Sequence, residues 1–96
     1  LLSWIHPSAV VAETACIEPG CFIGAKAVLQ PFSKIGMGCI INTGAVLEHH
    51  ACLGENVHVG PNAVVCGQAA VADDCMVGAG SVIRQGLIVA SGVTLG

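Results

Sequence analysis

The sequence predicts an all-β chain, a single-stranded parallel β-helix built from repeats of six residues. A branched aliphatic residue stands at every sixth position from Ile5 to Leu95, at sixteen positions without a break. Two residues before each lies a second column, in which thirteen of the sixteen members are Ser, Ala or Cys. Because a period of six is not helical, and because short strands joined by corners of one length must wind into coils, this repeat indicates a solenoid.

Each repeat divides into a strand and a corner. The small residue and the aliphatic residue lie two apart, so both face the interior of the coil, as the two-residue period of a strand requires. We therefore expect strands at 3–5, 9–11 and 15–17, and at every further step of six. The three residues after each strand form a corner rich in Gly, Pro, Asn and Asp, such as Pro19 and Gly20, which supply preset turns or positive φ.

The pattern resembles the known hexapeptide-repeat β-helix. This resemblance implies three hexads in each coil, a left-handed winding and about five coils for the chain. A left-handed crossover is an exception to the usual right-handed rule for parallel strands. The strands then fall on three faces, of which face A begins with 3–5, face B with 9–11 and face C with 15–17.

The outward residues of face B form a valine stripe, which consists of Val10, Val28, Val46, Val64 and Val82. A soluble monomer rarely exposes a contiguous apolar stripe. We therefore predict a homotrimer closed around this face, an arrangement that also covers a thin core. The alternative is that valine stands there because a β-branched side chain suits a strand.

The composition limits the class of partner. A chain of 96 residues forms one domain, 1–96. Its apolar content of 54% excludes a disordered segment, and no apolar run reaches the ~18 residues of a membrane span. A net charge of -3 argues against binding nucleic acid. Three of the six cysteines occupy the small-residue column and none forms a C-x-x-C pair, so we expect reduced thiols, a cytoplasmic location and no membrane partner.

The histidines stand out against the repeat. His49 is a corner residue after a strand of face B and directly follows Glu48, whose carboxylate can fix the tautomer of the ring and raise its basicity. We therefore take His49 as a candidate general base. His58 is the outward residue of a face-A strand, whereas His6 and His50 are expected to be solvated surface residues.

Two other chemistries are weaker. Zinc usually needs three or four convergent ligands, and His49, His50 and His58 do not stack at the spacing of one coil. We therefore expect no metal. Nucleophilic catalysis by a Cys–His pair is less favoured still, because the best-placed cysteines point into the core.

Three runs carry a narrower resemblance. They are 5–11 (IHPSAVV), 41–54 (INTGAVLEHHACLG) and 58–67 (HVGPNAVVCG). Together they resemble the sugar acyltransferases of the sialic acid O-acetyltransferase and bacillosamine N-acetyltransferase type. The N-T-G-A-x-x-E-H block, followed nine residues later by His58, is much more specific than the six-residue pattern. The resemblance implies an acetyltransferase that moves an acetyl group from acetyl-CoA to a hydroxyl or amine of a sugar or nucleotide sugar.

The resemblance also implies the roles of individual residues. His49 is the general base, and Glu48 orients it. Asn42 lines the same site, while His58 contacts the acetyl group or its carrier. These four assignments come from the matching motif rather than from the spacing of the repeat.

The coenzyme is expected as acetyl-CoA, a cosubstrate. The resemblance implies that backbone amides of Gly67 and of the corner at Ala79 hold its pantetheine arm. Along the edge that carries His49 and Gly67, a further coil brings Arg84, whose guanidinium suits a phosphate of the coenzyme. The alternative for Arg84 is a solvated corner charge.

Members of that family carry an N-terminal Rossmann-like domain and a C-terminal tail that caps the solenoid, and we expect neither within these 96 residues. A second hypothesis is therefore a non-catalytic trimeric scaffold or fragment that keeps the family residues but lacks the acceptor-binding domain. Turnover with a nucleotide amino-sugar or a sialic acid distinguishes the two. The residues leave open the identity of the acceptor and the choice between O- and N-transfer.

Overall fold

The computed structural model describes residues 2–96, and the all-β prediction is confirmed. Sixteen two-residue strands recur at intervals of six. They are β1 (Trp4–Ile5), β2 (Val10–Val11), β3 (Cys16–Ile17), β4 (Phe22–Ile23), β5 (Val28–Leu29), β6 (Lys34–Ile35), β7 (Ile40–Ile41), β8 (Val46–Leu47), β9 (Cys52–Leu53), β10 (His58–Val59), β11 (Val64–Val65), β12 (Ala70–Val71), β13 (Met76–Val77), β14 (Val82–Ile83), β15 (Ile88–Val89) and β16 (Thr94–Leu95).

The strands are one residue shorter than the sequence pattern predicts. In sheets B and C the expected first residue of each strand instead closes the preceding corner. Ala45, for example, donates its N–H to the carbonyl of Asn42 at 3.1 Å, and Ala51 donates to Glu48 at 3.1 Å. These bonds span three residues, as in a tight turn. The small side chain still points inward, so the two inner columns are confirmed although the strand bounds differ.

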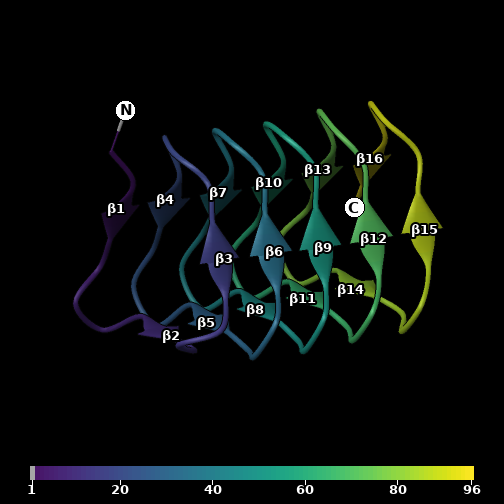
Figure 1. Ribbon diagram of the computed structural model, residues 1–96. Helices are drawn as coiled ribbons and strands as arrows, with labels where there is room; N and C mark the ends of the chain where they lie inside the picture. Colours follow the sequence, from purple (N-terminus) through teal and green to yellow (C-terminus); the bar gives the residue numbers. More distant parts are fainter. Residues whose placement is uncertain (1) are drawn as a thin grey trace.

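The chain winds with three hexads to a coil. Trp4 pairs with Phe22 and Ile5 with Ile23, in parallel and at a spacing of one coil. The strands form three parallel sheets: sheet A in the order β1-β4-β7-β10-β13-β16, sheet B in the order β2-β5-β8-β11-β14 and sheet C in the order β3-β6-β9-β12-β15. Figure 1 shows the chain descending at the back, crossing below and rising at the front as it advances from N to C, which is a left-handed winding. The predicted left-handed β-helix of about five coils is confirmed.

The core is a stack of the two inner columns. Ile23, Ile41, Leu47, Val59 and Val65 have no accessible surface. Each is covered from both sides because its strand pairs with the strands one coil before and one coil after. At the N-terminal end of the described coils the same column is less covered, and Ile5 is 44% exposed. The stacking of coil upon coil therefore buries the core.

Every corner from Gly20 to Gly92 has one residue with positive φ, at a spacing of six. Seven of these residues are not glycine, among them Phe32 (φ 63°), His50 (φ 61°) and Gln68 (φ 62°). Inter-coil hydrogen bonds hold the conformation: the N–H of His50 donates to the carbonyl of Pro31 at 3.2 Å. Because the backbone repeats from coil to coil, side chains at equivalent corners leave it in the same direction, and the rings of Phe32 and His50 stack.

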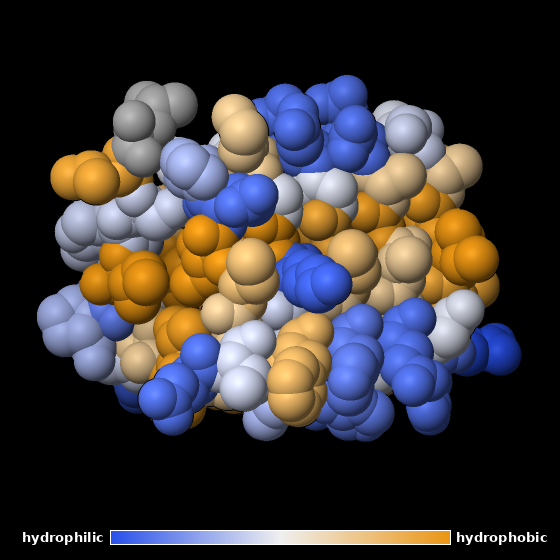
Figure 2. Space-filling view, in the orientation of Figure 1, coloured by the Kyte–Doolittle hydropathy of each residue, from blue (hydrophilic) through white to orange (hydrophobic). Residues whose placement is uncertain are grey.

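Apolar side chains also line the outside. The valine stripe forms one ladder on sheet B, with Val46 paired to Val28 and Val64. Sheet A carries a second exposed apolar ladder, in which the rings of Trp4 and Phe22 stack at 4.9 Å. Figure 2 looks onto sheet C, where mostly apolar residues follow the middle of the face, interrupted by one hydrophilic residue, and hydrophilic ones gather along the corners above and below. Residues 2–96 contain no helix that is long and apolar enough to cross a membrane.

The six cysteines are free thiols in residues 2–96. Cys21, Cys39 and Cys75 face the core, as the small-residue column predicts, and their thiols donate to backbone carbonyls at 3.0–3.1 Å. Burial raises the pKa of Cys39 from 9.0 to about 11, with the neighbouring Cys21 adding to the effect. The Cys39 thiol is therefore held in its protonated form at neutral pH.

We expect the thiols of the folded protein to be alkylated at different rates. At pH 8 the exposed Cys16 and Cys52 should be alkylated readily, whereas Cys39 should react about 100-fold more slowly, since a pKa raised by two units lowers the thiolate fraction by that factor. The thiolate forms first in the unfolded chain, so the free energy of unfolding should also decrease as the pH rises from about 9 to about 11. Mass spectrometry of timed alkylations measures the rates. Equal rates at Cys39 and Cys52 in the folded protein would contradict this packing.

Candidate active site

The candidate residues lie along two edges of the triangular solenoid. The edge between sheets B and C carries Glu48 and His49 after β8, Gly67 after β11 and Arg84 after β14. The edge between sheets A and B carries Asn42 after β7 and Ala79 after β13, with His58 beside it on β10. Within one chain the full width of sheet B separates these two groups. The fold therefore assembles two partial sites rather than one.

Each ring nitrogen of His49 lies close to another residue. Its Nδ1 lies 3.2 Å from Nδ1 of His50, and the two rings meet edge to face with centroids 5.5 Å apart. On the other side the ring lies against Gly67, where a Cβ would be 2.9 Å from Nε2 of His49. Only glycine leaves room for the imidazole in this position. Gly67 therefore allows the ring to lie here, a role that its sequence position alone does not reveal.

Glu48 does not make the predicted contact. It is half-buried, its backbone N–H donates to the carbonyl of Val65 at 2.9 Å, and no hydrogen bond or ion pair from its carboxylate to His49 occurs in residues 2–96. The hydrogen-bond partner of His49 is instead His50. The expectation that His50 is a solvated surface residue is thus incomplete, because its exposed ring also stacks on Phe32, with centroids 5.2 Å apart and planes at 20°.

Asn42 and His58 are brought together, as the resemblance implies. Oδ1 of Asn42 accepts the backbone N–H of Thr43 at 2.7 Å, so the amide nitrogen of Asn42 faces His58 and lies 3.4 Å from its Nε2. An amide nitrogen can only donate, so Nε2 of His58 is the acceptor and its proton lies on Nδ1. His58 pairs in the sheet with Ile40 and Met76, which leaves its ring in an apolar column.

The two remaining candidates are backbone and surface groups. Ala79 is exposed at its corner, and its N–H lies 2.8 Å from where a Cβ on Gly60 would stand, so Gly60 allows the close approach of the two coils. Arg84 is exposed, and its carbonyl accepts the N–H of Leu87 at 3.2 Å. Within the described part of the chain, no three His, Cys, Asp or Glu side chains gather so as to hold a metal ion.

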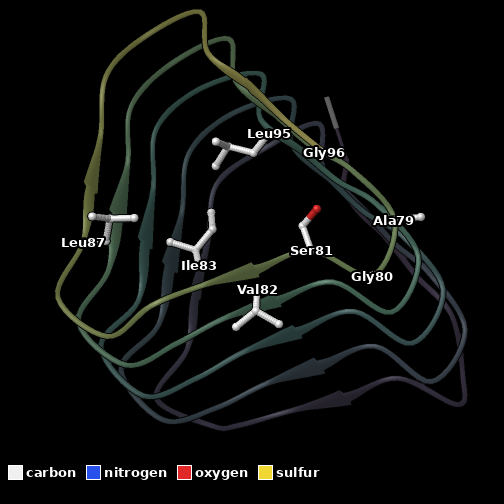
Figure 3. A pocket seen from close by; sticks show the side chains of 8 residues that line it. All are labelled: Ala79, Gly80, Ser81, Val82, Ile83, Leu87, Leu95 and Gly96. Carbon is white, nitrogen blue, oxygen red and sulfur yellow. The ribbon is translucent and has the colours of Figure 1, made fainter.

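A hollow opens at the C-terminal end of the solenoid, beside the corner that carries Ala79. It has a volume of about 410 Å³. Figure 3 looks along the solenoid onto this end and shows Ser81, Ile83 and Leu95 directed toward the interior. Ser81, Ile83, Leu87 and Leu95 belong to the inner columns, so this hollow is mainly the open end of the core, and Ala79 is the one candidate residue that lines it.

A family model described as bacterial transferase hexapeptide (six repeats) matches residues 17–49, 32–67 and 50–85. The chain belongs to this family of hexapeptide-repeat transferases. No curated protein sequence gives a significant match.

Solved structures narrow the resemblance. The acetyltransferase domain of PglB from Neisseria gonorrhoeae, in complex with acetyl coenzyme A, is 37% identical and superposes with a TM-score of 0.91 over 96% of this chain and 45% of that one. PerB from Caulobacter crescentus, in complex with CoA and GDP-perosamine, is 32% identical with a TM-score of 0.79 over 94% of this chain and 52% of that one. The predicted similarity to sugar acetyltransferases is confirmed. The chain spans about half the length of these structures.

Proposed function

We propose that the chain is an acetyltransferase core that moves an acetyl group from acetyl-CoA to a hydroxyl or amine of a nucleotide sugar. The observation that carries the proposal is the setting of His49, whose Nδ1 is engaged by His50 while its Nε2 lies over the side-chain-free Gly67. A ring with one engaged and one available nitrogen is suited to general base catalysis. The bound acetyl-CoA of the PglB domain and the bound GDP-perosamine of PerB support the two substrate classes.

The reaction needs no covalent intermediate on the protein. Nε2 of His49 takes the proton of the acceptor hydroxyl or amine, and the acceptor atom forms a bond to the thioester carbonyl carbon. The tetrahedral oxyanion is stabilised by backbone N–H groups. When it collapses, the carbon–sulfur bond breaks, and the CoA thiolate receives the proton from the His49 imidazolium. The products are the acetylated sugar and CoA.

A homotrimer completes the site. Each chain offers His49 on one edge of sheet B and the Asn42–His58 pair on the other. If the valine stripes of three chains face a common axis, the edge between A and B of one chain abuts the edge between B and C of its neighbour. His58 and Asn42 then face His49 across the interface. The apolar ladder on sheet B supports this arrangement, because association would cover valines that are exposed at Val10 and Val82 and half-buried between them.

The coenzyme follows the edge that carries the base. Gly67 leaves its backbone open to the amides of the pantetheine arm, and Ala79 of the adjacent chain presents an exposed corner from the other side. Arg84 lies one coil beyond Gly67, about 5 Å by the spacing of strands, where a phosphate pairs with its guanidinium. Glu48 remains a candidate for electrostatic support of the imidazolium. The six free thiols favour a reducing, cytoplasmic compartment.

The competing function is a trimeric scaffold that keeps the residues but does not catalyse transfer. Release of the CoA thiol from acetyl-CoA distinguishes the two. We expect release only when a GDP- or UDP-linked amino sugar is present at high concentration, with one acetylated sugar formed for each thiol. Binding of acetyl-CoA without acceptor-dependent release would favour the scaffold.

A further inference from the structure

We propose that His50 is a positioning residue that fixes the tautomer of His49. The inference rests on the proposed function, in which Nε2 of His49 accepts the proton of the acceptor. Its basis is the contact between the two Nδ1 atoms at 3.2 Å, made by neighbouring residues at one corner. The rings meet at an interplanar angle of 85°, which directs the edge of one toward the other.

The contact between two Nδ1 atoms admits one proton. A neutral imidazole carries a single N–H, so in a hydrogen-bonded pair one ring donates and the other accepts. When His49 donates from Nδ1, its Nε2 keeps a lone pair and serves as the base. Nδ1 of His50 is then the acceptor, and the proton of His50 lies on its own Nε2. The opposite assignment puts the proton of His49 on Nε2 and blocks the base.

The ring of His50 is held on a second side. Phe32 occupies the same corner position one coil earlier, and both residues have φ near 60°. Their side chains therefore leave the backbone in parallel, and the rings stack with planes at 20°. The backbone N–H of His50 donates to Pro31, which fixes the corner itself. His50 cannot turn away from His49 without losing the stack on Phe32.

No other side chain competes for Nδ1 of His49 within residues 2–96. Glu48 precedes it in sequence, but its carboxylate makes no hydrogen bond to the ring. Gln68 occupies the corner position one coil after His50, and its backbone N–H donates to the carbonyl of His49 at 3.1 Å, not to the ring. The acceptor that orients the base is therefore an imidazole. It accepts the hydrogen bond without carrying a negative charge of its own.

Glycine and aspartate at position 50 separate this role from a structural one, because both residues tolerate the positive φ of the corner. His50→Gly removes the acceptor, and His50→Asp restores one. Gln68→Gly is the matched control, since it makes the same backbone change at the same corner position of the next coil, where φ is 62°. The readouts are the ¹⁵N shifts of the His49 ring in histidine-labelled protein without ligand, and kcat and KM for acetyl-CoA.

In the wild type we expect His49 to be protonated at Nδ1. His50→Gly should give a mixture of tautomers and a kcat lower by about 10-fold to 100-fold, the effect known for partners that orient metal-binding histidines, with KM for acetyl-CoA unchanged. His50→Asp should restore both the tautomer and kcat, and Gln68→Gly should change neither.

The inference is overturned if His49 keeps its Nδ1 proton in His50→Gly, or if Gln68→Gly shifts the ring signals as much. A failure of the proposed function looks different. In that case the wild type releases no thiol, while the ¹⁵N shifts still respond to His50→Gly and recover in His50→Asp.

Discussion

Replacing His49 by alanine should reduce the rate of acetyl transfer by about 10²–10⁴, the usual contribution of a general base, and leave the affinity for acetyl-CoA close to that of the wild type. The affinity is preserved because the ring lies over Gly67 at the reacting end of the proposed coenzyme path and not at its phosphates. Calorimetry with acetyl-CoA and the rate of thiol release measure the two quantities separately.

Two further substitutions serve as comparisons for His49→Ala. His6→Ala removes a histidine of the first coil, whose Nδ1 accepts the N–H of Ser8, and should leave the rate unchanged. Arg84→Ala should instead weaken the binding of acetyl-CoA and reduce the dependence of that binding on salt. A His49→Ala variant with the turnover of the wild type would remove His49 from the mechanism. Equal affinity in Arg84→Ala would remove only the proposed phosphate contact.

The second large effect concerns stability. Leu53→Ala should lower the free energy of unfolding by about 2–5 kcal/mol, since it deletes buried methyl groups and leaves a cavity. Leu53 is 3% exposed and pairs with Ile35 and Val71 in the coils on either side. A cavity in the middle of the stack cannot be filled by collapse from one end.

Cys52→Ala is the matched control, because Cys52 is the outward neighbour of Leu53 on the same strand. A surface change of this kind should alter stability by no more than about 0.5 kcal/mol. Denaturant unfolding measures both variants at one chain concentration, since association with other chains would add to stability. Similar losses in the two variants would contradict the assignment of inward and outward columns.

The six-residue pattern predicts the fold because stacking makes each position depend on its equivalents in the neighbouring coils. An inward residue such as Leu47 meets Leu29 and Val65, so the aliphatic column is required in every coil. The strand bounds were wrong by one residue for a local reason. In sheets B and C the N–H of the first inward residue closes the corner, a bond that the hydrophobic pattern does not encode.

The edge on which each candidate lies was also predictable, since it follows from the count of residues around the coil. The partner of His49 was not. Its contact with His50 depends on two side-chain orientations and on the stack of His50 on Phe32. The only sequence signal was that positions 32 and 50 are one coil apart at the same corner. The carboxylate of the preceding residue instead pointed to Glu48.

A site shared between chains is tested most directly by mixing two inactive variants. His49→Ala lacks the base on the edge between sheets B and C, and His58→Ala lacks the histidine beside the other edge. Equimolar chains are unfolded and refolded together, and thiol release with acetyl-CoA and an amino-sugar nucleotide is measured. In random trimers each interface has about a one in four chance of combining intact His49 with intact His58, so we expect about a quarter of the wild-type rate. Mixed trimers that form but show no more activity than either variant alone would contradict a site built by two chains.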